Sequence, residues 1–409
     1  MQNFLSTNCG RVCLTTDTWT SNQNFTYMSL TAYFVDLNWK LHKHILNFCQ
    51  VTSHSGEVIG ATVESCLNSW NLNQVFSVTV NNASSNDVAI RYLKQRLNSW
   101  NNSILNGDYI HLRCCAHVLN LIVKERLKEI DNSILKIRNA VKYVKSSTPR
   151  GLRFQKCVEL EKIQCRALPC MDVETRWNST FHMLDVALKH RKAYELLALK
   201  DNSYIAELGG GKGIGVPSNA DWEYVQSIIP FLRLFNDATI CISGSLYVTS
   251  DMYMKEVFAI GRSIRHICEN YDDLSTSSIA KRIKVKYDKY WGNSDSVNML
   301  LLIAVILNPM QKIEYVNYFL DYLFGVEKGA ELKLKLVKCL KLLYQQYQDI
   351  ERGSEVDTQD VQASNSDIDP HGMAFFLQAT GRRSNTKSEL DRYLQEECEP
   401  YSHKFDILN

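Results

Sequence analysis

VFSVTVNNASSNDVAI, residues 75–90, is the most informative stretch of this chain for its architecture. Its first part, Val75 to Val80, is a compact run of apolar and β-branched residues, which predicts a buried strand. The polar run that follows is rich in helix-capping residues and predicts a helix from about Asp87 to Leu97. A buried strand that leads into a helix start is the repeating unit of α/β sheets, in which ligands gather at the carboxyl ends of the strands.

The segments on either side of this stretch extend the pattern. Segments rich in β-branched and aromatic residues precede it, and short polar links between them are typical of hairpins. We expect strands at 11–19, 25–35 and 40–51, a helix at 56–70, the strand at 75–80, the helix at 87–97, a strand at 109–113 and a long helix at 116–145. The order β-β-β-α-β-α-β-α implies a mixed sheet with helices on both faces, which is the element order of the ribonuclease H-like fold.

The remainder of the chain is predicted to be mainly helical, so the class is α/β plus all-α. Predicted helices lie at 178–199, 221–238, 249–271, 277–291 and 332–347. We expect four parts: a sheet-containing core at 1–145, a large helical insertion at 146–348, an acidic and polar disordered linker at 349–387, and the start of a further segment at 388–409.

Composition excludes a wholly disordered chain, because 45% of the 409 residues are hydrophobic and 22% are charged. The formal net charge is only +2, but it is unevenly distributed. Residues 349–369 hold seven acids against one base, Arg352, so the remaining 45 bases and 37 acids leave a formal +8. A basic body is compatible with a polyanionic partner, and it is also compatible with a purely solubilising role.

Two further features concern the compartment. The thirteen cysteines show no regular framework, and the N-terminus lacks the pattern of a secretory signal, so we expect free thiols in a reducing, intracellular compartment. The longest apolar run, 299–307, is about half of what a bilayer span needs. We therefore expect no membrane partner.

Two polar positions lie where α/β sheets form metal sites. Asp17 lies within a predicted strand, and an acid projecting from a central strand can hold Mg²⁺, although it can equally cap a turn with Thr18 or Ser21. Asn81 follows the strand at 75–80, where a metal-dependent nuclease or transposase would need a second carboxylate. Because an amide oxygen brings no negative charge, we expect weak two-metal binding and take Asp17 as the candidate metal ligand.

A cysteine and a histidine form a second candidate site. In RCCAHVLNL, residues 113–121, Cys114 and His117 are spaced to share one helix face. A zinc site needs four ligands, usually as two spaced pairs, and no second pair follows in the sequence. The pair either binds metal with distant partners or is packed structurally.

Basic and aromatic residues in the helical part are candidate nucleic-acid contacts. Arg176 and Trp177 in ETRWNST combine a cation for phosphate with a flat surface for base stacking, or the tryptophan anchors a helix start. The stretch 279–289 holds five cations, of which we take four as candidate contacts: Lys281, Arg282, Lys284 and Lys286. These cations either form a solvated helix face or follow a DNA backbone, and in the second case binding would depend strongly on salt.

Six segments in order resemble the transposases of the hAT superfamily, in particular their plant-type, sleeper-like domesticated relatives. They are LTTDTWTS (14–21), TVNNASSNDVAI (79–90), RCCAHVLNLIV (113–123), ETRWNST (174–180), LNPMQKIEYV (307–316) and SELDRYL (388–394). The resemblance implies a ribonuclease H-like catalytic domain interrupted by a large helical insertion. It also implies DNA as the partner and the nucleus as the location.

The resemblance also assigns residues. The catalytic set of this family is two Asp and one Glu: the first matches Asp17, the second falls on Asn81, and we expect no candidate for the Glu in this chain. It implies that Cys114 and His117 form the CxxH motif and that Arg176 and Trp177 lie near the transposon end. LNPMQK departs from the family, which usually has an Asp at Asn308.

We expect the chain to be truncated at both ends relative to this family. The BED-type zinc finger would lie upstream, and most of the dimerisation segment would follow SELDRYL. A homodimer is therefore expected only if that segment were complete.

The leading hypothesis is a DNA-binding, hAT transposase-derived protein without transposition activity. We expect no resident cofactor, and Mg²⁺ only in a catalytically competent form. One alternative is a fragment of an active Mg²⁺-dependent DNA transposase. The other is a protein-interaction module with no DNA role.

Overall fold

The computed structural model of the chain describes residues 4–5, 9–128, 132–173, 176–211, 213–270, 274–356, 388–402 and 405–408. It divides into two compact units. The first combines Met1–Leu112 with Val297–Asn409, and the second is Arg113–Ser296. The first unit is therefore built from two stretches of chain that are far apart in the sequence.

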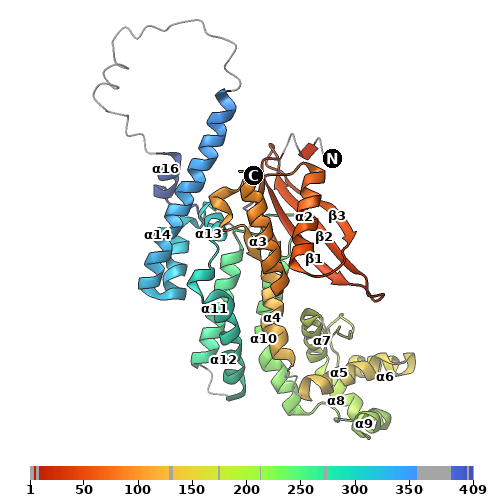
Figure 1. The fold of residues 1–409 in the computed structure, drawn as a ribbon. Helices are drawn as coiled ribbons and strands as arrows, with labels where there is room; N and C mark the ends of the chain where they lie inside the picture. Colours follow the sequence, from red (N-terminus) through yellow and green to blue (C-terminus); the bar gives the residue numbers. More distant parts are fainter. Residues whose placement is uncertain are drawn as a thin grey trace, which may run out of the picture. The chain divides into compact units, whose positions relative to one another are not determined.

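A five-stranded mixed sheet forms the centre of the first unit (Figure 1). Its strands are β1 Val12–Thr20, β2 Thr26–Val35, β3 Leu41–Gln50, β4 Val75–Val80 and β5 His111–Arg113. The spatial order is β3-β2-β1-β4-β5. Because β1 runs antiparallel to β2 and parallel to β4, the sheet is mixed, and the predicted ribonuclease H-like element order is confirmed.

Helices α2 Gly56–Trp70 and α3 Ser84–Ser99 pack together over the buried side chains of the sheet. Their close approach requires a glycine: a Cβ on Gly60 would lie 2.8 Å from Cδ1 of Tyr92. The buried carboxylate of Glu64 accepts hydrogen bonds from the hydroxyl of Tyr92 and, at 2.6 Å, from Nε of Arg96. Together these contacts hold α3, and with it the end of β4, in a defined position.

The chain returns to the first unit through α13 Met299–Ile306, α14 Lys312–Val356 and α16 Glu389–Gln395. Asn298, at the start of α13, donates through Nδ2 to the backbone carbonyls of Tyr109 and His111, each at 2.9 Å. Gln346 of α14 accepts a hydrogen bond from the backbone N–H of Leu105 at 3.1 Å. These bonds join segments nearly two hundred residues or more apart in the sequence, so local pattern does not reveal them.

Two of the six motifs, LNPMQKIEYV and SELDRYL, meet around one lysine. Lys312 is almost fully buried, and its Nζ donates to the backbone carbonyls of Tyr393 at 3.1 Å and Glu396 at 3.0 Å. The same ammonium lies 4.5 Å from the centre of the Tyr393 ring, whose hydroxyl donates to the carbonyl of Ile306. A buried ammonium is costly unless it is paired, and these partners provide that pairing.

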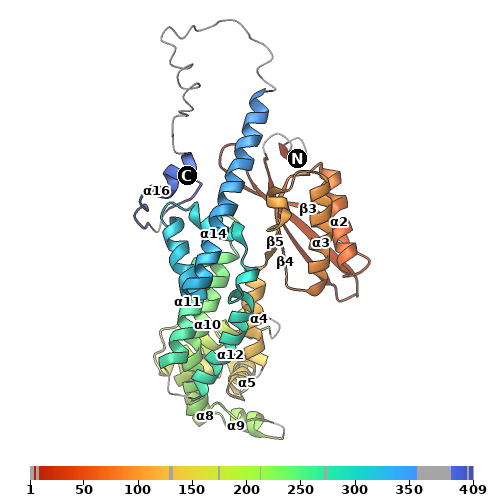
Figure 2. The same ribbon diagram turned by 60° about the vertical axis from the view of Figure 1, so that its left-hand side comes forward.

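Helices make up nearly all of the described part of the second unit. They are α4 Cys115–Lys128, α5 Asn132–Lys145, α6 Thr148–Leu160, α7 Trp177–Lys189, α8 Arg191–Lys200, α9 Asn202–Gly209, α10 Asn219–Ile242, α11 Tyr253–Asn270, α12 Leu274–Trp291 and the short η2 Ser294–Ser296. Helix α10 lies among the others, against α4, α5, α7 and α11 (Figure 2). By length and composition alone α10 could span a membrane, but its buried side chains pack inside this unit, as those of a core helix do.

Several predicted elements differ in extent from those observed. The helix expected at 116–145 is represented by α4 and α5, on either side of residues 129–131, which lie outside the described residues. The helix expected at 178–199 is two helices, α7 and α8. Helices α6, α9 and α13 lie in the part expected to be mainly helical, although no bounds were predicted for them. The part of α14 after Gly325, whose backbone is not helical (φ 77°), extends beyond the expected 332–347. Periodicity persists across such breaks because both helices turn an apolar face toward one core. The two compact units meet at Arg113 and Ser296, and the expected four-part division at 145, 348 and 387 stays a prediction. Most of the predicted disordered linker, from residue 357, lies outside the described residues.

A buried carboxylate fixes the start of α10. Asp221 accepts hydrogen bonds from Ser133 Oγ at 2.8 Å, from Lys136 Nζ at 2.9 Å and from the N–H of Ser218 at 2.7 Å. Although burial by itself raises the pKa of this carboxyl, the hydrogen bonds from Ser218, Lys136 and Ser133 outweigh it and lower the pKa to about 2. Asp221 therefore joins α5 to α10 as a charged group.

We expect the substitution Asp221→Asn to lower the free energy of unfolding at neutral pH by about 2 kcal/mol, the equivalent of the pKa shift. Because the pKa of the folded state is depressed, the wild-type carboxylate stabilises above about pH 4, and this stability is lost as the pH falls toward the folded pKa. The variant should lack this pH dependence in denaturant unfolding. Glu223→Gln, at an exposed position of the same helix, serves as the control. An Asp221→Asn protein as stable as the wild type at neutral pH would contradict the assignment.

Candidate functional site

Asp17 lies in the middle strand of the sheet, on β1, directly opposite Ser29 of β2. Its side chain is exposed, because residue 16 turns toward the buried core and residue 17 toward the other face. Oδ1 of Asp17 accepts a hydrogen bond from the N–H of Thr18 at 3.0 Å. The carboxylate is thus accessible and held at a defined place on the sheet.

Asn81 is brought against Asp17, as the strand-end argument predicted. It directly follows β4, which pairs in parallel with β1, so the two positions reach the same edge of the sheet. Nδ2 of Asn81 donates to Oδ1 of Asp17 at 3.3 Å. The sequence placed these two side chains together, although it did not reveal how the amide is oriented.

Backbone hydrogen bonding fixes that orientation. The N–H of Ala83 donates to Oδ1 of Asn81 at 3.2 Å, and a backbone N–H can bond only to the oxygen end of an amide. The buried Asn86 donates through Nδ2 to the same Oδ1 at 2.5 Å and to the backbone carbonyl of Asn81 at 3.1 Å. Sequence reasoning missed Asn86, for which the only signal was its place in the cap-rich NNASSND segment.

This donor set does not fit the paired magnesium ions that the family resemblance implies. One carboxylate is present, the side-chain oxygen of Asn81 is already occupied by two donors, and the side-chain N–H of Asn81 faces the carboxylate. Mg²⁺ requires oxygen ligands in near-octahedral geometry and is repelled by an N–H donor. Among the residues that the structure describes, no three His, Cys, Asp or Glu side chains form a cluster suited to a metal.

Cys114 and His117 lie at the start of α4, in the second unit. The N–H of Val118 donates to the carbonyl of Cys114 at 3.0 Å, so the helical hydrogen-bond pattern already includes Cys114. Both side chains are half-buried. They share the first turn of α4, as their spacing predicted, and a metal-binding role for them stays a prediction.

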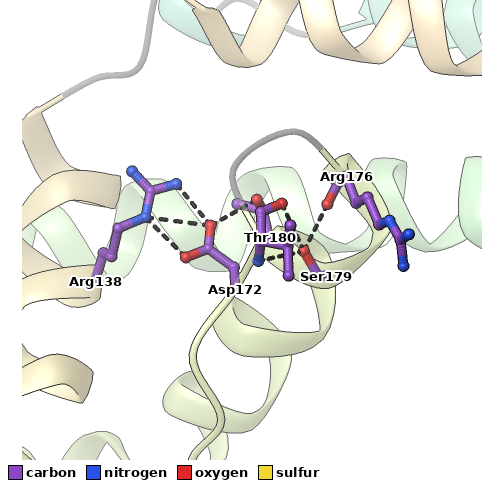
Figure 3. A network of polar contacts seen from close by, with 6 residues as sticks. Arg138, Asp172, Arg176, Ser179 and Thr180 are labelled. Carbon is purple, nitrogen blue, oxygen red and sulfur yellow. Dashed lines mark hydrogen bonds and ion pairs between the residues drawn. The ribbon is translucent and has the colours of Figure 1, made fainter. Parts of the chain in front are cut away.

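Arg176 and Trp177 are adjacent, but their side chains have different surroundings. Trp177 is the first residue of α7 and is only 4% exposed, so its indole presents no face to a base. The stacking role expected for Trp177 is therefore wrong. The alternative, a tryptophan that anchors a helix start, is what the structure contains. Arg176 is exposed, and its guanidinium points away from the neighbouring polar network (Figure 3).

That polar network holds the segment before α7. Asp172 forms a bidentate ion pair with Arg138 of α5, with Oδ1 2.9 Å from Nε and Oδ2 2.7 Å from Nη2, and the Asp172 side chain is only 1% exposed. Thr180 Oγ1 donates to Oδ2 of Asp172 at 2.7 Å. Although burial raises the pKa of Asp172, the hydrogen bonds from Arg138 and Thr180 lower it below its ordinary value. Sequence reasoning did not identify this pair, because Arg138 and Asp172 carry no shared motif.

Ser179, in the first turn of α7, also holds the segment before this helix. Its Oγ accepts from the N–H of Val173 at 2.8 Å and lies 2.6 Å from the carbonyl of Arg176, to which it can donate (Figure 3). The backbone on both sides of Arg176 is thus tied to the first turn of α7. Arg176 is presented to solvent beside this hydrogen-bonded turn.

Helix α12 carries the remaining predicted cations. Its buried side chains Ala280, Ile283, Tyr287 and Trp291 recur at helical spacing and form the face that packs inside the unit. Lys281 and Arg282 are exposed, Lys284 and Lys286 are half-exposed, and Lys284 pairs with Asp288 at 2.5 Å. Residues 280–291 hold five cations and one acid, so this part of the helix is strongly basic.

Three consecutive parts of the chain match known protein families. Residues 15–109 match the "ZBED1 RNase-like domain", residues 112–231 the "ZBED1 RNase-like helical domain", and residues 251–347 the "hAT-like transposase, RNase-H fold". The change from the first to the second match falls where the chain leaves the first compact unit. The matched families thus describe a ribonuclease H-like protein with a helical part.

Whole-chain relatives agree with the family matches. The chain is 31% identical to "Zinc finger BED domain-containing protein RICESLEEPER 2" of Oryza sativa subsp. japonica, over 100% of this chain and 57% of that protein. It is 28% identical to "Zinc finger BED domain-containing protein DAYSLEEPER" of Arabidopsis thaliana, over 98% of this chain and 55% of that protein. The chain therefore spans about half the length of the curated relatives it matches.

A mixed sheet of this topology with a helical part defines a ribonuclease H-like protein, and the match of residues 251–347 is to hAT-like transposases of that fold. The chain contains the RNase-H-like domain of hAT transposases and is a transposase-derived protein related to the sleeper proteins. The predicted resemblance is confirmed.

Proposed function

We propose that this chain is a nuclear DNA-binding protein derived from a hAT transposase, and that its 409 residues have no metal-dependent strand-transfer activity. The observation that carries the second part is the orientation of Asn81, whose side-chain N–H faces Asp17. Strand transfer in a ribonuclease H-like site depends on metal ions held between carboxylates. Removal of such an electrostatic group typically costs orders of magnitude in rate.

DNA binding is supported by charge and by relationship. Outside residues 349–369 the chain has a formal charge of +8, and α12 concentrates five cations within twelve residues. Arg176 adds an exposed guanidinium, and its backbone carbonyl is hydrogen-bonded to Ser179. Clustered cations attract the phosphate backbone of DNA without regard to sequence, so we expect binding with modest sequence preference.

A salt series tests the DNA-binding part. For the wild type, fluorescence anisotropy with labelled duplex DNA should give an affinity that falls steeply between about 50 and 200 mM salt. The double variant Lys281→Ala/Arg282→Ala should bind more weakly, and its slope of log affinity against log salt should be smaller by about 2, because each of the two cations neutralises one phosphate in the wild type. The control Lys156→Ala/Lys192→Ala removes the same charge from exposed positions on α6 and α8.

Two outcomes would contradict the DNA-binding part. Negligible binding by the wild type at low salt would favour a protein-interaction module with no DNA role. If the slope of log affinity against log salt fell equally in both double variants, α12 would not be the contact surface. The reduction would then reflect only the lower net charge. The catalytic part has its own test: robust Mg²⁺-dependent nicking of terminal-repeat DNA that disappears on Asp17→Ala would contradict it.

A further inference from the structure

The turn between β2 and β3 presents two large apolar side chains to solvent. Leu37 is 75% exposed and Trp39 is 68% exposed, and both lie in the turn at residues 36–40 of the first unit. Tryptophan, with tyrosine and arginine, is enriched among the residues that dominate binding energy when a partner buries them. Neither the ribonuclease H-like sheet nor the proposed contacts on α12 account for this exposed pair.

Trp39 also has an unusual backbone conformation. Its φ is 59°, in the left-handed region that bulky L-residues rarely adopt. Hairpin turns of this kind usually place Gly or Asn at the left-handed position. A tryptophan here combines backbone strain with exposed apolar area, and an outlier of this kind motivates a hypothesis of function.

Asp36 holds the turn in this conformation. Its Oδ1 accepts from the N–H of Asn38 at 2.9 Å and from the N–H of Lys40 at 3.0 Å, and its Oδ2 lies 2.7 Å from Nε2 of His42. The hydrogen bond to His42 and those from the backbone lower the pKa of Asp36. The side chain of Trp39 is therefore presented from a preformed turn, and its binding needs little further ordering.

The charged residues around the turn indicate which class of partner fits it. Between residues 26 and 50 the cations are Lys40 and Lys43, both exposed, and the single acid, Asp36, is engaged by His42. An exposed aromatic ring beside exposed lysines is the combination that binds single-stranded nucleic acid, in which bases stack and phosphates meet cations. A protein pocket for Trp39 would not require these cations.

We propose that Trp39 stacks on an unpaired base of a DNA strand while Lys40 and Lys43 contact the phosphates of the same strand. This inference rests on the proposed DNA binding and adds to it a second contact surface and a preference for unpaired DNA. The tip of the β2–β3 hairpin is then a single-strand contact, separate from α12 in the sequence and in the compact unit to which it belongs.

Anisotropy titration of labelled oligo(dT) with the full chain tests this proposal. Stacking on one base corresponds to an affinity change of about 5- to 150-fold, so Trp39→Asn should weaken oligo(dT) binding within that range, and Trp39→Phe should retain most of it. Duplex binding should change less than oligo(dT) binding. Because Asn accepts the left-handed conformation readily, the Tm of Trp39→Asn should equal or exceed that of the wild type. Leu246→Asn, which also removes an exposed apolar side chain, is the control.

The possible outcomes separate the two proposals. Equal oligo(dT) affinity in wild type and Trp39→Asn would overturn this inference and leave DNA binding by α12 intact. Absence of wild-type binding to both duplex and oligo(dT) would overturn both. A change in molar mass by light scattering on Trp39→Asn, with unchanged oligo(dT) binding, would identify the turn as a protein contact and overturn the DNA assignment.

Discussion

The substitution Asn81→Asp is expected to raise the affinity of the chain for Mg²⁺ by roughly 30-fold. In the variant, one oxygen would still accept from the N–H of Ala83 and from Asn86, and the other would replace the N–H that now faces Asp17. An added charge about 4 Å from a divalent ion contributes about 2 kcal/mol even in the dielectric of water, which applies here because Asp17 is exposed.

Isothermal titration with MgCl₂ measures this change directly. Without Mg²⁺ the variant places two carboxylates in contact, so its Tm should fall below that of the wild type and recover on addition of the metal. The double variant Asp17→Asn/Asn81→Asp is the matched control, because it again has one acid and should lose the gain. A variant with unchanged Mg²⁺ affinity would show that the two side chains do not form a common site.

The substitution Asp172→Ala is expected to destabilise the second unit by about 3–5 kcal/mol. The reason is burial: with the Asp172 carboxylate removed, the guanidinium of Arg138, whose side chain is 8% exposed, is left without its bidentate partner. Thr180 loses its acceptor as well. Denaturant unfolding followed by circular dichroism measures the destabilisation, and proteolysis should become faster near residue 173 as the segment before α7 is released.

Asp185→Ala is a suitable control for this prediction. Asp185 lies on α7 and pairs with Lys189 at 2.6 Å and Arg233 at 2.5 Å, but both cations are about half exposed. Exposed ion pairs of this kind contribute about 1 kcal/mol or less. If Asp172→Ala cost no more than Asp185→Ala, the Arg138–Asp172 pair would not be what holds the segment before α7.

The local sequence pattern was enough to predict most strands and helices of the first unit. The strands and helices between Val12 and Ser99 follow the predicted segments closely, because alternation and helical spacing depend on which face of each element is buried. The same pattern failed between Trp177 and Lys200, where a continuous apolar stripe concealed the break between α7 and α8. Helix α6 has few buried residues and therefore little periodicity to detect.

The candidate site was predicted in part. Sequence placed Asp17 and Asn81 at one sheet edge, since the strand carrying Asp17 and the strand that ends before Asn81 were expected side by side. The sequence could not decide the role of Trp177, because the neighbouring residues are compatible both with a buried helix anchor and with an exposed stacking ring. It also passed over Trp39, whose left-handed backbone and exposure are properties of the folded turn.

By itself the sequence determined the element order, the family and the replacement of an acid by Asn81, because these depend on residue identity and on spacing along the chain. Only the tertiary structure decided that the amide of Asn81 turns its N–H toward Asp17, because that orientation depends on the N–H of Ala83 and on Asn86. Only the fold returns Val297–Asn409 to the first unit, through hydrogen bonds between residues nearly two hundred or more apart. Such contacts gain their energy from burial and pairing in three dimensions, which no local pattern records.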